Sequence, residues 1–253
     1  MADPAPDAAL REAADVSAPI IRMENVGVAF NAQLRVGSPR FWALEDVNLS
    51  LAPGDRLGVV GRNGSGKSTL LRTIAGIITP DRGRLERAPV SCQLLSLALG
   101  FVPHLSGRDN AVLSGLMLGL RRREIMQRLP AILEFSELGD FFDQPISSYS
   151  TGMTMRLGFS VAMQVEPDVL LIDEVLAVGD TEFQQKSGNA LRERIHSGKT
   201  IVIVSHDDEQ IQQVCNRALW IEHGRSMMQG PVDAVLAAYH AAPSPSSPPL
   251  AGS

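Results

Sequence analysis

The sequence predicts an α/β fold with a parallel-sheet core, a small antiparallel β part and a helical insertion. Residues 169–172 and 200–204 are continuous runs of Leu and β-branched side chains, which is typical of strands covered on both faces of a parallel sheet. A glycine-rich loop at 61–68 stands between a short apolar run and a helical segment. Residues 105–165 have helical spacing and no strand pattern. Strands and helices that alternate in this way, around an inserted helical part, define the class.

The remaining elements follow in chain order. Strands are predicted at 20–30, 42–51 and 56–61, before a helix at 67–75. The spacing from Ser106 to Asp109 fits a capping box at a helix start inside the insertion. Further helices are predicted at 181–196 and 207–216. Residues 217–222 and 225–228, joined at His223 and Gly224, predict a hairpin or an edge pair.

Length and composition predict one ordered domain between two tails. The chain has 253 residues, of which 44% are apolar, enough for one large or two small cores. Residues 1–18 and 241–253 are rich in Ala, Pro and Ser, so we expect them to be disordered. The ordered domain is then 19–240, with its helical subdomain at about 105–165.

Charge and cysteine content exclude several classes of protein. The 23 basic and 28 acidic residues give a net charge of −5, which argues against binding nucleic acid through bulk positive charge. Cys92 and Cys215 are too few for a disulfide framework. No apolar run reaches the ~18 residues of a membrane span, and the N-terminus lacks the pattern of a secretory signal. These features predict a cytoplasmic protein.

The strongest motif is the glycine-rich loop. Gly61, Gly66, Lys67 and Ser68 fit the pattern G-x-x-x-x-G-K-[ST] at every fixed position. Glycines let the backbone wrap around phosphate oxygens, while successive N–H groups and the helix start supply positive charge. Lys67 is expected to reach the β- and γ-phosphates, and the Ser68 hydroxyl to bind Mg²⁺. An ordinary glycine-rich turn is the alternative. The expected nucleotide-binding residues here are Gly61, Arg62, Asn63, Gly64, Ser65, Gly66, Lys67, Ser68 and Thr69.

Acidic and histidine side chains follow two of the predicted strands. Asp173 and Glu174 end the strand at 169–172, at the edge of the sheet where ligands gather. Asp173 is expected to hold Mg²⁺, directly or through water, and Glu174 to face the attacking water. His206 follows the strand at 200–204 and is predicted to sense the γ-phosphate. The plainer alternatives are a strand that leaves the core and a structural histidine. The loop and the acids together predict Mg²⁺-dependent hydrolysis of a nucleoside triphosphate.

These elements, in this order, resemble the ATPase subunit of ABC transporters, a P-loop NTPase fold. The deciding segment is Tyr149-Ser150-Thr151-Gly152-Met153, with Arg156 three residues on, at the place of the family's signature. In that family the signature of one subunit caps the ATP held by the other. The resemblance therefore implies a homodimer in which Ser150 and the Gly152 N–H contact the partner's γ-phosphate. ATP and Mg²⁺ are the implied cofactors.

The resemblance is closest to ATPases that export O-antigen, capsular polysaccharide and teichoic acid, and it covers residues 20–240. It rests on the signature, on Gly107-Arg-Asp-Asn110 and on residues 173–180 with Phe183. It implies an ABC-2-type permease as the membrane partner, a lipid-linked polysaccharide as cargo, and a peripheral location on the cytoplasmic face of the inner membrane. Asp180 matches the D-loop at the dimer interface. Phe30 lies where the family stacks adenine, and Phe41 or Trp42 are the alternatives.

Two departures from the family pattern stand out. The Q-loop glutamine, which senses Mg²⁺ and the membrane subunit, is expected near Leu97. Gln93 is close but out of register, so the Q-loop residue stays open. Some O-antigen ATPases also carry a C-terminal carbohydrate-binding domain, for which this chain lacks the length.

Three other functions compete with polysaccharide export. The first is an ABC exporter for a lipid or a drug, or an importer, and the signature variant speaks against it. The second is an ABC ATPase acting on ribosomes or DNA, which usually carries two ATPase units. The third is an adaptor with a dead nucleotide site, which the presence of every catalytic residue type opposes. Separately, Arg121, Arg122 and Arg123 form either a solvated helix face or a contact to a membrane partner or anionic lipid.

Overall fold

A computed structural model describes residues 18–31, 40–95, 97–173 and 180–242 of the chain. The strands are β1 (Ile21–Asn31), β2 (Arg40–Leu51), β3 (Arg56–Val60), β4 (Arg82–Arg87), β5 (Cys92–Leu94), β6 (Val169–Asp173), β7 (Thr200–Val204), β8 (Arg217–Glu222) and β9 (Arg225–Pro231). The helices are α1 (Lys67–Ile74), α2 (Gly107–Met117), α3 (Arg122–Ser136), α4 (Thr151–Ala162), α5 (Thr181–Ile195), α6 (Asp208–Val214) and α7 (Val232–Ala241). Two short 3-10 helices, Gly139–Asp143 and Ile146–Ser148, join α3 to α4.

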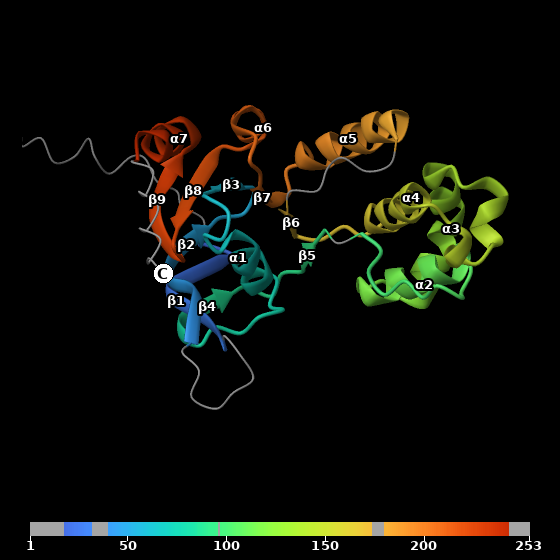
Figure 1. Ribbon diagram of the computed structural model, residues 1–253, viewed down its shortest axis with the longest axis horizontal. Coiled ribbons are helices and arrows are strands. Elements are labelled where there is room, and N and C mark those ends of the chain that lie inside the picture. Colours follow the sequence, from blue (N-terminus) through green and yellow to red (C-terminus); the bar gives the residue numbers. More distant parts are fainter. Residues whose placement is uncertain (1–17, 32–39, 96, 174–179, 243–253) are drawn as a thin grey trace, which may run out of the picture.

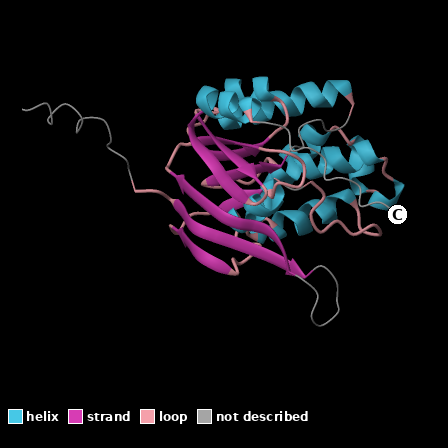
Figure 2. Cartoon of the chain, turned by 60° about the vertical axis from the view of Figure 1, so that its left-hand side comes forward, coloured by secondary structure: helices cyan, strands magenta, loops and turns pink. Residues whose placement is uncertain are grey.

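The strands form one mixed sheet in the order β4-β1-β2-β9-β8-β3-β7-β6-β5. Strands β8, β3, β7, β6 and β5 pair in parallel, whereas β1 pairs antiparallel with both β2 and β4. Figure 2 shows the strands gathered in one part of the molecule, with the helices packed beside them. This arrangement confirms the predicted parallel core with a small antiparallel part.

The parallel strands are buried on both faces by two different hydrophobic clusters. Val202 and Val204 of β7 pack into the cluster that contains α1, whereas Ile201 and Ile203 pack into the cluster that contains α5, α6 and α7. Side chains alternate across a strand, so a run of apolar residues fills both clusters at once. The continuous apolar runs of the sequence are explained by this two-sided burial.

The segment between β5 and β6 forms a separate helical unit with its own core. Helices α2, α3 and α4 pack around Ile125, Phe142, Leu157 and their neighbours, and Figure 1 shows this unit beside the sheet. Helix α2 begins at Gly107, and the side chain of Ser106 before it accepts a hydrogen bond from the Asp109 N–H, which is one of the two bonds of the predicted capping box. Among the described residues, no helix is long and apolar enough to cross a membrane.

The elements that the sequence did not predict are β4, β5 and α7. Strand β4 has the sequence Arg-Gly-Arg-Leu-Glu-Arg and lies at the sheet edge, largely exposed. Strand β5 has three residues, too few for a recognisable period. Helix α7 follows β9 directly at Val232 and ends at Ala241, one residue beyond the expected domain limit.

Candidate functional site

The loop between β3 and α1 has the geometry of a phosphate-binding loop. Gly66 caps α1 with φ +107°, and a Cβ there would lie 2.4 Å from the Ala43 carbonyl oxygen. Gly61 has φ +152°, and its Cβ would lie 2.1 Å from the Ile221 carbonyl oxygen. Both positions therefore require glycine, for conformation and for space. The N-terminal N–H groups of α1 face the loop, where they attract an anion.

Lys67 is held by the loop that precedes it. Its side chain is buried, and Nζ donates hydrogen bonds to the carbonyl oxygens of Gly61 (2.7 Å) and Arg62 (2.9 Å). A buried ammonium group needs such partners to offset its lost hydration. The contacts fix the positive charge beside the first turn of α1.

A hollow of about 340 Å³ lies over the loop and joins residues from distant parts of the chain. Lys67 and Ser68 from α1, Asp173 from the end of β6, and His206 after β7 meet there. The carboxyl ends of β3, β6 and β7 share one edge of the sheet because these strands run parallel. The full lining is Phe30, Phe41, Ala43, Asn63, Gly64, Gly66, Lys67, Ser68, Thr69, Asp173, Val204 and His206.

The oxygen ligands in this hollow suit a magnesium ion. The Ser68 hydroxyl and the Asp173 carboxylate both line it, and both are hard donors of the kind that Mg²⁺ prefers. Within the described ranges, no group of three or more His, Cys, Asp or Glu residues could hold a metal alone. Mg²⁺ commonly takes one or two protein ligands and completes its shell with water and phosphate. The residues present fit that pattern.

Two exposed aromatic rings form one wall of the hollow. Phe30 of β1 is 44% exposed and Phe41 of β2 is 60% exposed, and they are paired across the two strands. Trp42 instead stacks under the Arg82 guanidinium, at 4.3 Å. An exposed large ring beside a polar hollow offers a stacking face for a flat ligand. The geometry therefore offers Phe30 and Phe41, rather than Trp42, for that purpose.

Ser150, Gly152 and Asp180 lie outside this hollow. Ser150 is exposed and caps α4, accepting a hydrogen bond from the Met153 N–H at 3.2 Å. A Cβ on Gly152 would approach nothing nearer than Ser150 Oγ, at 3.8 Å, so its surroundings are open. Asp180 caps α5 through the Phe183 N–H at 3.0 Å, and that bond, with the Arg156 guanidinium, lowers the pKa of Asp180. Ser150 and Asp180 are exposed, Gly152 is half-buried, and none of the three lines the nucleotide hollow of its own chain.

Other expected site residues have different surroundings. Glu174 lies outside the described residues. Gly61, Arg62 and Ser65 belong to the loop but do not line the hollow, and Ser65 Oγ is buried without a hydrogen-bond partner among the described residues. Gln93 is buried in β5, paired with Leu170, and also lies outside the hollow. Ala43 and Val204 line it but were not predicted, because a small apolar residue leaves no chemical signal.

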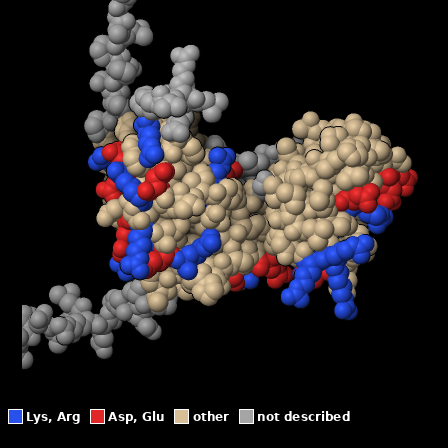
Figure 3. All heavy atoms as spheres, turned by 90° about the horizontal axis from the view of Figure 1, so that it is seen from below, with Lys and Arg blue, Asp and Glu red and all other residues tan. Residues whose placement is uncertain are grey.

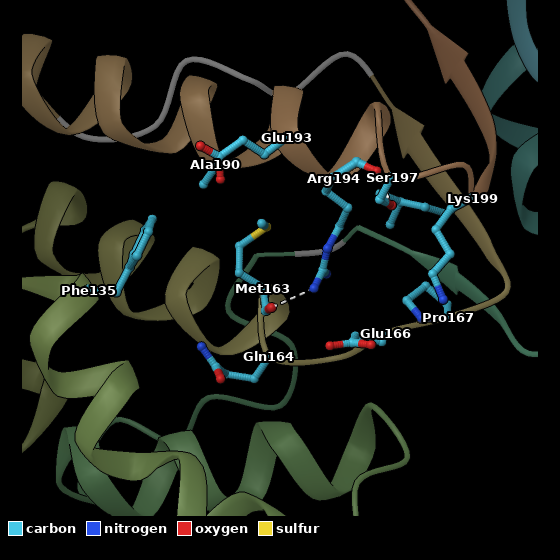
Figure 4. A pocket seen from close by; sticks show the side chains of 11 residues that line it. Phe135, Met163, Gln164, Glu166, Pro167, Ala190, Glu193, Arg194, Ser197 and Lys199 are labelled. Carbon is cyan, nitrogen blue, oxygen red and sulfur yellow. Dashed lines mark hydrogen bonds between the residues drawn. The ribbon is translucent and has the colours of Figure 1, made fainter.

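A second hollow, of about 410 Å³, lies between α5 and the segment that follows α4 (Figure 4). Arg194 reaches across it and donates to the carbonyl oxygens of Met163 (2.8 Å) and Val165 (2.6 Å). Desolvation by burial lowers the pKa of Arg194. Because both terminal nitrogens of Arg194 bond to main-chain carbonyls, the side chain ties α5 to the end of α4.

The fold and the glycine loop define a P-loop nucleoside triphosphatase domain. Residues 44–177 match the family model described as "ABC transporter". The chain belongs to the ABC transporter family, as one of its ATP-binding cassettes. This membership confirms the resemblance and the fold class inferred from the signature at Tyr149–Met153.

Relatives and solved structures agree with the family. The "O-antigen export system ATP-binding protein RfbB" of Klebsiella pneumoniae is 46% identical over 200 residues, which are 79% of this chain and 81% of that protein. The "Teichoic acids export ATP-binding protein TagH" of Enterococcus faecalis is 43% identical over 204 residues, which are 80% of this chain but 45% of that protein. A solved ATP-binding cassette, a dimer in a post-hydrolysis state with ADP and Pi, has a TM-score of 0.66 at 21% identity. It covers 84% of this chain and 98% of its own, and it shows the fold alone.

Proposed function

We propose that this chain is the ATP-hydrolysing subunit of an exporter that moves a lipid-linked polysaccharide across the cytoplasmic membrane. The single observation that carries the chemistry is the hollow in which Lys67, Ser68, Asp173 and His206 meet over the glycine loop. The class of cargo is supported by relatives named for O-antigen and teichoic acid export, at 40 to 46% identity.

Each residue of the hollow has a task set by its chemistry. Lys67 places a fixed positive charge where the β- and γ-phosphates bind, and the N–H groups of Gly66 and its neighbours bind the same oxygens. Ser68 and Asp173 would hold Mg²⁺, which neutralises charge on the phosphates when bound. His206 is placed to contact the γ-phosphate. Phe30 and Phe41 provide the face on which the adenine stacks.

Hydrolysis needs a second copy of the chain. The ATP held by one subunit is closed over by Ser150, the Gly152 N–H and Asp180 of the partner subunit. The positions of Ser150 at the start of α4 and of Asp180 at the start of α5, both exposed and outside the hollow, support this arrangement. The start of α4 then directs its partial positive charge at the γ-phosphate.

A separate permease of the ABC-2 type is the proposed membrane partner, and the relatives named as ATP-binding proteins of export systems support it. We place the dimer on the cytoplasmic face of the inner membrane, bound to that permease. Closure of the dimer moves the helical unit of α2, α3 and α4, and the permease follows that movement. Hydrolysis then resets the dimer.

The test of this function is the variant Glu174→Gln. Glutamine keeps the size of the side chain but removes the base that polarises the attacking water, a contribution of about 10²–10⁴-fold. We expect ATP turnover to fall by that factor while ATP still binds and holds the dimer closed. Glu193→Gln, an exposed position on α5, is the matched control and keeps normal turnover.

The same variant tests the cargo in cells. Lipid-linked polysaccharide accumulates in the cytoplasm and surface polysaccharide disappears, if the proposed cargo is correct. An unchanged cell surface with lost ATPase activity would leave an ABC exporter of a different cargo, such as a lipid or a drug. Near wild-type hydrolysis by Glu174→Gln would contradict the catalytic assignment itself.

A further inference from the structure

Four charged side chains of alternating sign join three helices at one place. In order of contact they are Asp180, Arg156, Glu137 and Lys186. Arg156 of α4 pairs with the Asp180 carboxylate and, through Nη1, with Glu137 Oε2 at 3.1 Å. Glu137 Oε1 accepts a hydrogen bond from Lys186 Nζ at 2.6 Å. These ion pairs therefore link the start of α5 to α4, α4 to the end of α3, and the end of α3 back to α5.

Arg156 is the centre of this network. Its side chain is 18% exposed, less than that of any other arginine in an ion pair among the described residues. The guanidinium lies 5.0 Å from the centre of the Phe183 ring. The Phe183 N–H donates the hydrogen bond to Asp180 Oδ1 that caps α5. A planar guanidinium can serve two carboxylates at once, which a lysine ammonium cannot do with the same geometry.

Glu137 and Lys186 extend the network from Arg156 to the end of α3 and back to α5. Glu137 ends α3 with φ +55°, a conformation that glycine adopts more easily at a helix end. A glutamate at this position strains the backbone, and its two carboxylate oxygens contact Arg156 and Lys186. Lys186 also donates to the Phe135 carbonyl oxygen at 3.0 Å. Phe135, Phe159 and Phe183 pack under these charges, with ring centroids 5.8–6.2 Å apart.

We propose that Arg156 is a positioning residue for ATP turnover, fixing the start of α5 with Asp180 against the helix that begins at Ser150. This inference rests on the proposed function, in which Ser150 and Asp180 both reach the partner subunit. Ser150 and Asp180 can both contact the partner subunit only when α4 and α5 keep a fixed orientation relative to each other. An error of about 1 Å in such a placement can cost ~10²-fold in rate. Arg156 contacts the second helix directly, whereas it does not line the nucleotide hollow of its own chain.

The test compares Arg156→Gln with Arg156→Lys and with Arg108→Gln. Arg108 is a matched control in the same helical unit, because its Nε lies 2.7 Å from Asp143 and its guanidinium 5.1 Å from the Phe142 ring. We expect Arg156→Gln to lower kcat by about tenfold or more, with KM for ATP within about twofold. Arg156→Lys, which keeps one ion pair, recovers part of kcat. Arg108→Gln leaves kcat and KM close to wild type.

Two further measurements on the full chain separate positioning from folding. The Tm of Arg156→Gln stays within about 4 °C of that of Arg108→Gln, because the two ion pairs that it removes are partly exposed and each contributes little to stability. Hydrogen exchange at the Phe183 amide becomes faster in Arg156→Gln and not in Arg108→Gln. A wild-type kcat in Arg156→Gln would overturn the inference, and so would unchanged exchange at Phe183 or an equal loss of kcat in Arg108→Gln. A wild-type chain without ATPase activity would instead contradict the proposed function. Hydrogen exchange at the Phe183 amide would then still test whether Arg156 holds Asp180 and the start of α5.

Discussion

At the scale of single residues, the site depends on positions whose space, backbone conformation or hydrogen bonds require one residue type. The Cβ of any other residue at Gly61 or Gly66 would collide with a main-chain carbonyl oxygen. Lys67 is buried against two carbonyl oxygens of its own loop. Because of these constraints, the sequence motif at 61–68 is enough to predict the phosphate-binding loop that the structure has. Gln93 is different, because its buried amide has no hydrogen-bond partner among the described residues.

Replacing Gln93 by leucine is expected to stabilise the protein. Gln93 is 7% exposed, and neither its Oε1 nor its Nε2 has a hydrogen-bond partner among the described residues. An unsatisfied buried amide costs about 1–3 kcal/mol. Gln93→Leu should raise the free energy of unfolding by about 1–2 kcal/mol in urea titrations. Gln127→Leu, on the exposed side of α3, is the control and changes it by less than ~0.5 kcal/mol. A loss of stability in Gln93→Leu would show that the amide is satisfied in solution.

Asp168 predicts a defined dependence of stability on pH. Its Oδ2 accepts hydrogen bonds from the Ser91 N–H (2.8 Å) and the Ser91 hydroxyl (2.7 Å), and these bonds lower the pKa of Asp168. A carboxyl whose pKa is lower in the folded chain stabilises it above the unfolded pKa of about 3.9. That stabilisation is lost as the pH falls through the folded pKa.

The variant Asp168→Asn isolates this effect. The difference in unfolding free energy between wild type and Asp168→Asn should be largest near pH 6 and should shrink toward pH 3. Urea titrations at the two pH values measure it, and other carboxyl groups cancel in the difference. A difference that stays constant between pH 6 and pH 3 would contradict the assignment.

At the scale of elements, the sequence predicted those strands and helices whose burial is strong and regular. Strands β6 and β7 are buried on both faces, so their apolar runs are unmistakable. Strand β4 carries four charged residues and one half-buried leucine, because its edge position exposes it. Its pairing with β1 comes from the backbone, which leaves no pattern in side chains. Strand β5 was missed because three residues show no period, and Ala43 and Val204 were not expected in the hollow because small apolar side chains carry no chemical signal.

The parts of the candidate site that lie in a recognisable sequence motif could be predicted from the sequence. The glycine loop, Asp173 and His206 were found from local patterns, and the fold brings them into one hollow. The choice of Phe30 and Phe41 over Trp42 needed the structure, because it depends on Arg82 stacking on Trp42. The network around Arg156 also needed the structure, since its members are separated by up to 49 residues along the chain. Long-range ion pairs have no sequence period.

At the scale of the whole molecule, charged side chains of both signs are exposed on the surface (Figure 3). Figure 3 shows acidic and basic side chains mixed over the sheet part, with a group of basic side chains on the helical unit. Arg121, Arg122 and Arg123 are exposed at the start of α3. With a net charge of −5, the chain has no excess positive charge for nucleic acid. Both interpretations of these arginines, a solvated helix face and a contact to a membrane partner, are compatible with their exposure.

A mixture of two inactive variants tests whether each site is shared between subunits. Lys67→Ala removes the loop cation, and Ser150→Asp puts a carboxylate where the proposed function places the partner's phosphate, while aspartate can still cap α4. Neither homodimer keeps an intact site. A mixed dimer keeps one, made from the loop of one variant and the signature of the other. Equal mixing should restore about a quarter of wild-type ATPase activity, because half of the dimers are mixed. No recovery, with mixed dimers shown by cross-linking, would place each site within one chain.

The separate core of the helical unit has a consequence for the order of folding. Its buried residues lie between Ala111 and Val161, so its contacts are local along the chain. Strand β3, by contrast, pairs with β7 and β8, which lie more than 140 residues further on. Local contacts form early and distant pairings late. During synthesis from the N-terminus, the helical unit can therefore fold on the ribosome before β7 and β8, the neighbours of β3, have been synthesised. The nucleotide hollow, which needs Val204 of β7 and His206 beyond it, is among the last parts of the molecule to form.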